Sequence, residues 1–468
     1  MTELLHERVP ASLTLENLAA AVGARSGSAI LESGQGFGPM ARWSILAPPP
    51  VLVFEASDDD WTITEPTGSV VKHGSDDPLT ALGRWLEDLG LSASEFEDED
   101  DRPPFTGGLI GFFGYDLAPR IERLPRRSPR VSRIPDIRFG LHDICVTVDN
   151  SSGVAEVWGR RFPADPVRDL DERWRQFRRE LSHATETFPR RSVLSPPQSA
   201  FGRSQYVAAV RTARDYIAAG DIFQVNLSQR FSSEGTVDPL DLFLRLRKRS
   251  PAPHAAFLRW RDLAVVSASP ECFFATRGDR IVTRPIKGTR PRGLSPEDDA
   301  RLVAQLTGSL KDRAELTMIV DLERNDLGRI CRYGSVMVTE SGNVESFAQV
   351  HHRVATIEGR LRPGTTPMDV IQSVFPGGSI TGAPKIRAME IIDELEPNRR
   401  GLYTGAIGYY GVGTSAFNIA IRTILVEGDR ASYQVGGGIV DDSDPEAEYE
   451  ETLHKGRAMF DVLSGDDR

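Results

Sequence analysis

The fold class is decided by two apolar runs near the C-terminal end, Phe417-Asn418-Ile419-Ala420-Ile421-Arg422-Thr423-Ile424-Leu425-Val426 and Ala431-Ser432-Tyr433-Gln434-Val435-Gly436. Both are rich in β-branched and aromatic residues, which pack well on a pleated sheet, so each run predicts a strand. Residues 263–268 and 280–286 have the same character and also predict strands. The C-terminal half is therefore expected to contain a substantial β-sheet.

Helical patterns alternate with these strands. Ser204 is predicted to cap a helix, because apolar residues recur after it at helical spacing as far as Gly220. Pro384 is predicted to open a second helix. Asp444 is predicted to cap a last helix that reaches Leu463. Strands and helices in this density predict a mixed α/β fold.

A segment rich in proline and serine divides the chain. We expect an N-terminal lobe over residues 1–190, a linker over 191–203 and a larger lobe over 204–464. No internal repeat and no coiled-coil heptad is visible in the sequence.

Bulk properties exclude several classes of protein. The chain has 468 residues, 40% of them hydrophobic, and a net charge of -11, which argues against nucleic acid or an anionic membrane as a general partner. Cys145, Cys272 and Cys331 lie far apart, so neither a disulfide framework nor a zinc site is expected. There is no apolar run long enough to span a membrane and no N-terminal signal pattern. These features predict a cytoplasmic protein.

Two predicted helices carry acidic faces. Glu448, Glu451 and Lys455 are spaced so that they share one face of the last helix, and Asp312 and Glu315 are spaced three apart on another. Two acidic faces can hold one Mg²⁺ between them, because magnesium prefers carboxylate oxygens. A solvated face of surface ion pairs explains the same pattern.

A glycine run and a single arginine offer contacts for an anionic ligand. Gly436 to Gly438 follow a predicted strand, where their amides could approach a carboxylate, although a plain turn or bulge needs the same residues. Arg422 lies inside an apolar strand and needs a counter-charge there. That counter-charge is either a substrate carboxylate or a structural ion pair.

Lys287 and a pair of histidines complete the residues with chemical potential. Lys287 ends a predicted strand, where a lysine with a lowered pKa can act as a nucleophile, while most lysines simply face solvent. His351 and His352 are adjacent and face opposite sides of any strand, so at most one belongs to a site. From physical reasoning alone, the chain could bind a magnesium-chelated dianion.

Six motifs in a fixed order give the sequence a specific resemblance. They read Gly220-Asp221-Ile222-Phe223-Gln224-Val225-Asn226-Leu227-Ser228-Gln229-Arg230, Ser269-Pro270-Glu271, Pro285-Ile286-Lys287-Gly288-Thr289-Arg290-Pro291-Arg292, Asp321-Leu322-Glu323-Arg324-Asn325-Asp326, Phe375-Pro376-Gly377-Gly378-Ser379-Ile380-Thr381-Gly382-Ala383-Pro384-Lys385 and Glu448-Tyr449-Glu450-Glu451-Thr452. Together they resemble the chorismate-utilising enzymes, which include anthranilate, aminodeoxychorismate, isochorismate and salicylate synthases. The resemblance is strong over 204–464, the expected chorismate-binding lobe, and weaker before it. It implies a two-lobed α/β (α+β) fold with large antiparallel sheets packed face to face and helices outside.

The resemblance also implies a role for each matched residue. Glu271 matches the general acid that protonates the departing carbon-4 hydroxyl, and His352 matches a histidine beside that hydroxyl. Mg²⁺ would be bound by Glu315 and Glu451, with Glu448 nearby, and would bridge to the ring carboxylate of chorismate. Substrate-binding positions are implied at Gly288, Thr289, Tyr403, Arg422, Gly436, Gly438, Lys455 and Gln224.

Two residues distinguish between members of the family. Water-using members carry a lysine base where this chain has Gln224, and a carboxamide cannot deprotonate water, so ammonia is the expected nucleophile. Anthranilate synthases usually have alanine at the position of Lys287, whereas aminodeoxychorismate synthases have lysine. The resemblance therefore implies covalent catalysis by Lys287 and a product that feeds para-aminobenzoate and folate synthesis. Anthranilate synthesis, or a non-catalytic chorismate-binding regulatory subunit, is the alternative.

The resemblance has further consequences for ligands and partners. Leu31-Glu32-Ser33 is similar to half of the tryptophan pocket of anthranilate synthases, but a tyrosine and a methionine of the other half are absent from Ala252-Pro253-His254-Ala255-Ala256-Phe257. At most, we therefore expect a relic of the tryptophan pocket at Glu32 and Ser33. No glutaminase nucleophile motif occurs, so a separate glutamine amidotransferase subunit is expected to supply ammonia.

Overall fold

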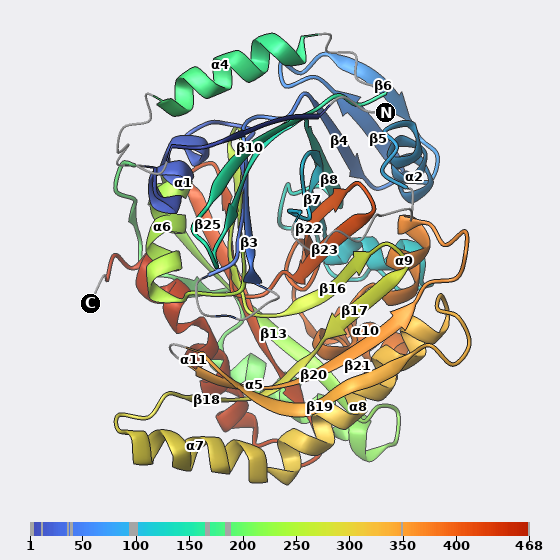
Figure 1. Cartoon of the computed structure of the whole chain (residues 1–468). Coiled ribbons are helices and arrows are strands. Elements are labelled where there is room, and N and C mark those ends of the chain that lie inside the picture. The colour runs from blue at the N-terminus through green and yellow to red at the C-terminus, as the bar shows by residue number, and fades with distance from the viewer. Residues whose placement is uncertain are drawn as a thin grey trace.

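The computed structural model describes residues 4–10, 13–34, 37, 41–92, 102–163, 169–182, 189–347 and 350–466. Within these ranges, two large antiparallel sheets form a sandwich with helices on its outer faces (Figure 1). This confirms the expected mixed α/β fold. No helix in the described ranges is long and apolar enough to cross a membrane.

Both sheets combine strands from the two ends of the chain. In spatial order, the first sheet consists of β1 (Leu4–Arg8), β10 (Ala155–Arg160), β9 (Ile144–Asp149), β3 (Trp43–Ala47), β2 (Ala29–Glu32), β14 (His254–Trp260), β15 (Leu263–Ser269), β24 (Thr423–Glu427), β25 (Arg430–Ile439), β13 (Gln224–Thr236) and β11 (Val193–Leu194), with β12 (Gln198–Ser199) and β21 (Gly382–Ala383) also paired to β13. The second sheet consists of β18 (Ile286–Pro291), β20 (Val350–Arg360), β17 (Arg280–Arg284), β16 (Cys272–Arg277), β23 (Thr414–Ile419), β22 (Ala406–Gly411), β7 (Gly108–Phe113), β8 (Ile137–His142), β4 (Leu52–Ser57), β5 (Asp60–Thr64) and β6 (Val70–Gly74), with β19 (Met337–Ser346) paired to β20. The segment 191–203 contributes β11 and β12, which pair with β13.

The helices cover the outer faces of the sandwich. They are α1 (Leu15–Gly23), α2 (Pro78–Asp88), α3 (Ala118–Ile121), α4 (Leu170–Ser182), α5 (Arg203–Ala218), α6 (Pro239–Arg249), α7 (Pro296–Gly308), α8 (Leu310–Gly328), α9 (Pro367–Val374), α10 (Lys385–Leu395) and α11 (Pro445–Leu463), with the 3-10 turns η2 (Tyr115–Leu117) and η3 (Gly378–Ile380). Helices α1, α4, α6 and α11 share apolar contacts with the outer face of the first sheet, and α2, α8 and α9 with that of the second. A third apolar cluster, which includes Phe112, Trp260 and Tyr409, fills the space between the sheets.

The stretch over 417–426 is two strands, so the prediction of one continuous strand was wrong. β23 ends at Ile419 in the second sheet and β24 begins at Thr423 in the first. Arg422, between them, has φ 48°, in the left-handed region that side chains disfavour, and the backbone turns there. The chain therefore crosses between the sheets inside an apolar run, where composition gives no sign of a break.

A second crossing lies beside the first and runs in the opposite direction. β15 ends at Ser269 in the first sheet, and β16 begins at Cys272 in the second. The Ser269 hydroxyl donates to the Ile419 carbonyl at 2.6 Å, and the Ile419 amide donates to the Glu271 carbonyl at 3.1 Å. The two crossings are thus bonded together, and they carry Glu271 and Arg422.

Helix boundaries agree with expectation in two of three cases. Helix α10 follows Pro384, and α11 is capped by Asp444, whose carboxylate accepts the amides of residues 446 and 447. The predicted cap at Ser204 was wrong. Helix α5 begins at Arg203, after Gly202, because the Gln205 side chain reaches back to accept the Gly202 amide at 3.1 Å.

Candidate active site

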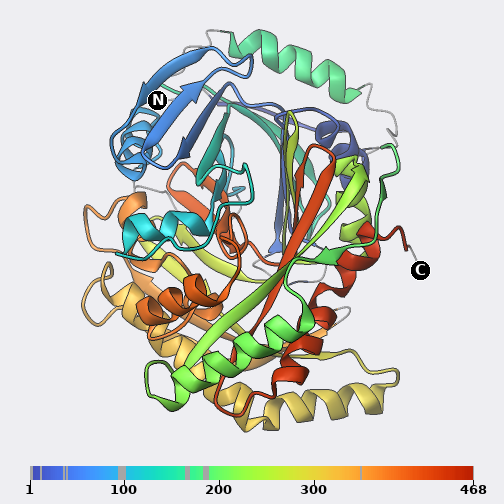
Figure 2. The ribbon, with the colours of Figure 1, turned by 180° about the vertical axis from the view of Figure 1, so that it is seen from behind.

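A cavity of about 460 Å³ opens where the two crossings meet β13, β18, β20, β25, α8 and α11. It brings together most of the residues predicted from the sequence: Glu271, Lys287, Gly288, Thr289, Glu315, His352, Tyr403, Arg422, Gly436, Gly438, Glu448, Glu451 and Lys455. Strands β13 and β25, which line one side of it, are paired and run side by side (Figure 2). A second cavity, of about 380 Å³, between β14 and β4 contains none of these residues.

Lys287 lies in a bulge near the start of β18. It does not end a strand as predicted, because the expected strand over 280–286 breaks at Pro285 and a new one begins at Ile286. The pairing of β18 with β20 shifts between Ile286 and Thr289, and Gly288 has φ 87°, which glycine tolerates. In the part of the chain that the structure describes, the Lys287 amine makes no hydrogen bond or ion pair. Burial lowers its pKa, which favours a neutral amine.

Glu271 faces the same cavity and is shifted in the opposite direction. Its side chain is 5% exposed, and its Oε1 has no hydrogen-bond partner among the described residues. Burial raises its pKa, which favours the protonated acid. Two groups whose pKa values are shifted in opposite directions thus share one cavity, an arrangement that could serve a nucleophile and a general acid.

His352 lies on β20 beside Thr289. The Thr289 hydroxyl and His352 Nδ1 are 2.8 Å apart, and burial lowers the pKa of His352 to about 3, so the imidazole is neutral at ordinary pH. His351 faces away from the cavity, with its Nε2 2.9 Å from Asp299. This arrangement is consistent with the prediction that at most one of the two histidines belongs to the site.

Arg422 and Tyr403 supply the polar groups of another wall. Within the described ranges, the Arg422 guanidinium forms no ion pair or hydrogen bond. Burial lowers its pKa, but an arginine side chain remains charged in a protein. Burial raises the pKa of Tyr403, which remains a neutral hydroxyl. A partly buried cation that forms no ion pair within the described ranges and a hydroxyl in the same cavity are suited to bind a carboxylate.

The glycine run lies within β25 and does not follow it, because its pairing with β13 continues to Ile439. A Cβ at Gly437 would lie 3.0 Å from Glu448 Oε2 and 3.7 Å from Glu451 Oε1. A side chain there would fill the space that these two carboxylates share. The glycine thus lets carboxylates from α11 approach the strand.

The acidic residues have the donor chemistry that a magnesium ion needs. Glu315 on α8 and Glu448 on α11 have pKa values raised by burial, as expected where negative charge is crowded. Burial would also raise the pKa of Glu451, but Lys455, 2.7 Å away, outweighs it and lowers the pKa. No three His, Cys, Asp or Glu side chains in the described residues converge closely enough to hold an ion by themselves. The set therefore fits an ion that takes its other ligands from substrate and water.

Three predicted residues lie outside the cavity wall. Gln224 is fully buried behind Gly438. A Cβ added at Gly438 would lie 2.6 Å from Gln224 Nε2. Glu32 is buried against α6, and its Oε1 accepts a hydrogen bond from Arg247 at 2.7 Å. The Ser33 carbonyl accepts a hydrogen bond from Asn150 at 2.7 Å. Glu32 is thus paired within the protein.

Several lining residues were not singled out from the sequence, among them Asn226, Ser379, Gln434 and Lys311. Period-two spacing would have found two of them, because Asn226 follows Gln224, and Gln434 precedes Gly436, on the same strand face. Lys311 lies one helical turn before Glu315 on α8. Ser379 lies in η3, where no regular spacing applies.

The chain is similar to several known proteins along most of its length. A model of the chorismate binding enzymes matches residues 49–461. The aminodeoxychorismate synthase component 1 of Bacillus subtilis is 40% identical over 441 residues, which cover 93% of this chain and 91% of the relative. The anthranilate synthase component 1 of Thermus thermophilus is also 40% identical, over 434 residues, covering 91% and 90%.

A solved structure has the same architecture. The anthranilate synthase component I of Streptococcus pneumoniae superposes with a TM-score of 0.79 at 34% identity, covering 90% of this chain and 92% of that one. The family model spans most of the chain, and several of the residues that line the cavity, among them Glu271, Lys287 and Glu451, come from the motifs that carry the resemblance. This chain belongs to the family of chorismate binding enzymes.

Proposed function

We propose that this chain is the chorismate-converting component of an aminodeoxychorismate synthase, whose product feeds para-aminobenzoate and folate synthesis. The observation that carries the proposal is the Lys287 amine, which faces the cavity with a lowered pKa and without an ionic partner among the described residues. The relatives leave the choice of product open, because aminodeoxychorismate and anthranilate synthases match at the same identity. The choice of aminodeoxychorismate as the product therefore rests on Lys287 in this proposal.

The proposed reaction uses two displacements across the chorismate ring. The neutral Lys287 amine forms a bond to carbon 2, the two conjugated ring double bonds each shift by one position, and the carbon–oxygen bond at carbon 4 breaks, so that the hydroxyl leaves as water with a proton from Glu271. Ammonia then bonds to carbon 4, both double bonds shift back, and the bond between carbon 2 and Lys287 breaks. Nitrogen therefore ends at carbon 4, whereas direct attack of ammonia at carbon 2 leads to anthranilate.

The other cavity residues bind and orient the substrate. Arg422 and Tyr403 would hold one carboxylate, and the amides of Gly436 and Gly438 the other. Glu315, Glu448 and Glu451 would hold Mg²⁺, which offsets the charge of the ring carboxylate when bound. Gln224 cannot deprotonate water, which supports ammonia as the nucleophile. A glutamine amidotransferase subunit would supply it, in keeping with relatives named component 1.

Product analysis tests this proposal. The protein incubated with chorismate, magnesium and ammonium is expected to form aminodeoxychorismate, identified by chromatography and mass spectrometry, without the fluorescence of anthranilate. The enolpyruvyl group should remain on the product. Strong anthranilate fluorescence without an added lyase would contradict the proposal, and absence of chorismate turnover would favour a non-catalytic binding subunit.

Removal of the cation should stop turnover. A chelator is expected to abolish activity, and added magnesium to restore it. Glu451→Gln is expected to raise the magnesium concentration for half-maximal rate by about ten- to hundredfold, a loss typical of a weakened metal site. Glu450→Gln on the same helix is the matched control, because Glu450 faces Arg203 at 3.2 Å outside the cavity. A rate unaffected by chelation would exclude the proposed cation.

A further inference from the structure

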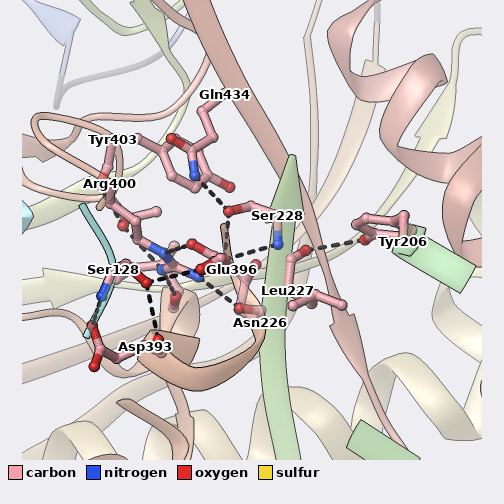
Figure 3. A network of polar contacts seen from close by, with 12 residues as sticks. Ser128, Tyr206, Asn226, Leu227, Ser228, Asp393, Glu396, Arg400, Tyr403 and Gln434 are labelled. Carbon is pink, nitrogen blue, oxygen red and sulfur yellow. Dashed lines mark hydrogen bonds and ion pairs between the residues drawn. The ribbon is translucent and has the colours of Figure 1, made fainter. Parts of the chain in front are cut away.

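A buried ion pair lies behind the cavity wall (Figure 3). Arg400 Nη2 and Glu396 Oε1 are 2.7 Å apart, and their side chains are 1% and 2% exposed. A buried ion pair costs desolvation, so it is weak evidence of a stabilising role and calls for another explanation. We refer to it as the Arg400–Glu396 pair.

Arg400 reaches three parts of the cavity wall. Its Nη2 donates to the Asn226 carbonyl at 2.7 Å, and its Nη1 donates to the Ile380 carbonyl at 3.1 Å. Its guanidinium also lies 5.4 Å from the ring centre of Tyr403. Asn226, Ile380 and Tyr403 all line the cavity. One buried cation therefore holds together segments that are far apart in sequence.

Glu396 fixes the direction of a chain of hydrogen bonds to a fourth part of the wall. Its carboxylate can only accept, and its Oε1 accepts the Ser228 hydroxyl at 2.6 Å and the Ser228 amide at 2.9 Å. The hydroxyl proton of Ser228 is thereby used. Its oxygen must therefore accept, and it does so from Gln434 Nε2 at 2.8 Å.

This direction leaves the carboxamide oxygen of Gln434 as an acceptor. Gln434 is 6% exposed and lines the cavity, and within the described ranges its Oε1 has no hydrogen-bond partner. A buried acceptor without a partner costs free energy unless a ligand satisfies it. Gln434 Oε1 is therefore left with an unused capacity to accept a hydrogen bond.

We propose that the Arg400–Glu396 pair and Ser228 are positioning residues, which fix Gln434 Oε1 as the acceptor of a hydrogen bond from a substrate N–H or O–H. The inference rests on the proposed function, in which ammonia and the chorismate hydroxyl are the available donors. Both are hydrogen-bond donors that the Gln434 carboxamide oxygen can accept. The KM values for ammonium and for chorismate distinguish between them.

Ser228→Ala tests the inference with little disturbance to the ion pair, because Arg400 and the Ser228 backbone amide still bond to Glu396. The KM for ammonium or for chorismate is expected to rise about three- to tenfold, the size of one uncharged hydrogen bond, while kcat changes less. A raised KM for ammonium assigns the donor to ammonia, and a raised KM for chorismate assigns it to the hydroxyl. Ser233→Ala is the matched control, because Ser233 is also buried on β13 and its hydroxyl has no partner among the described residues.

Gln434→Met supplies the second arm. It removes the acceptor but leaves the Ser228–Glu396 bond, so it is expected to raise the same KM as Ser228→Ala. The double variant should be no worse than either single variant, because both act through one hydrogen bond. Folded variants with unchanged KM values, or with strictly additive effects, would overturn the inference while wild-type turnover still supports the proposed function. A wild-type protein that does not convert chorismate would instead refute the proposed function.

Discussion

Lys287→Ala is expected to reduce the rate of aminodeoxychorismate formation by about 10³-fold or more, the scale seen when a covalent nucleophile is removed. The expected effect is large because burial lowers the pKa of Lys287, which favours the neutral amine that attacks carbon 2. The fold should be retained, because the amine makes no hydrogen bond or ion pair within the described ranges. Steady-state rates measured by product chromatography check this, and a small amount of anthranilate is expected from direct attack of ammonia at carbon 2.

The controls for Lys287→Ala distinguish the loss of the nucleophilic amine from the loss of one positive charge. Lys72→Ala removes a lysine from an exposed pair with Asp88 and should leave the rate unchanged. The wild-type rate should rise with pH through the lowered pKa of Lys287, since only the neutral amine attacks. Unchanged aminodeoxychorismate synthesis in Lys287→Ala would refute the covalent role.

Glu271→Gln is expected to lower turnover by about 10²- to 10⁴-fold, the usual contribution of a general acid. The carboxamide keeps the shape of the side chain but cannot deliver a proton to the departing hydroxyl. The loss should affect every product, including any anthranilate, because each route expels the same hydroxyl. Glu297→Gln, on the exposed start of α7, is the control that should leave the rate unchanged.

The pH dependence of Glu271 gives a second readout. Burial raises its pKa, so the required protonated form is lost as pH rises through that value, and the wild-type rate should fall there. The same raised pKa makes its contribution to stability greatest at low pH and lost as pH rises. Glu271→Gln should therefore keep its melting temperature at higher pH better than the wild type does. Near-normal turnover in the variant would exclude Glu271 as the acid.

Patterned elements could be predicted from the sequence, and points of backbone reversal could not. Helix α11 was predicted from Asp444 to Leu463 because a cap, a proline and helical spacing coincide. The crossing at Arg422 lies in a run rich in β-branched residues, which predicts one strand. The run is divided only because its two halves pair with different sheets. The bulge at Gly288 was likewise hidden, because it depends on the pairing with β20.

Predictions of the site followed the same division. Lys287, Glu271 and the acidic face of α11 were recognised from motifs, and all lie in one cavity. Arg400 and Glu396 were not, because they lie outside those motifs and form hydrogen bonds to residues 174 and 168 positions away. Ser228 was inside a motif, but only its bond to Gln434 gives it a role. Such partners become visible only in three dimensions.

The covalent step can be observed directly by mass spectrometry of protein quenched with acid after mixing with chorismate and magnesium in the absence of ammonia. We expect an adduct with the mass of chorismate less one water, on the peptide that contains Lys287 and absent from Lys287→Ala. The adduct should disappear on addition of ammonium as aminodeoxychorismate forms. Formation of aminodeoxychorismate without an adduct at any time, or with an adduct on another residue, would refute covalent catalysis by Lys287.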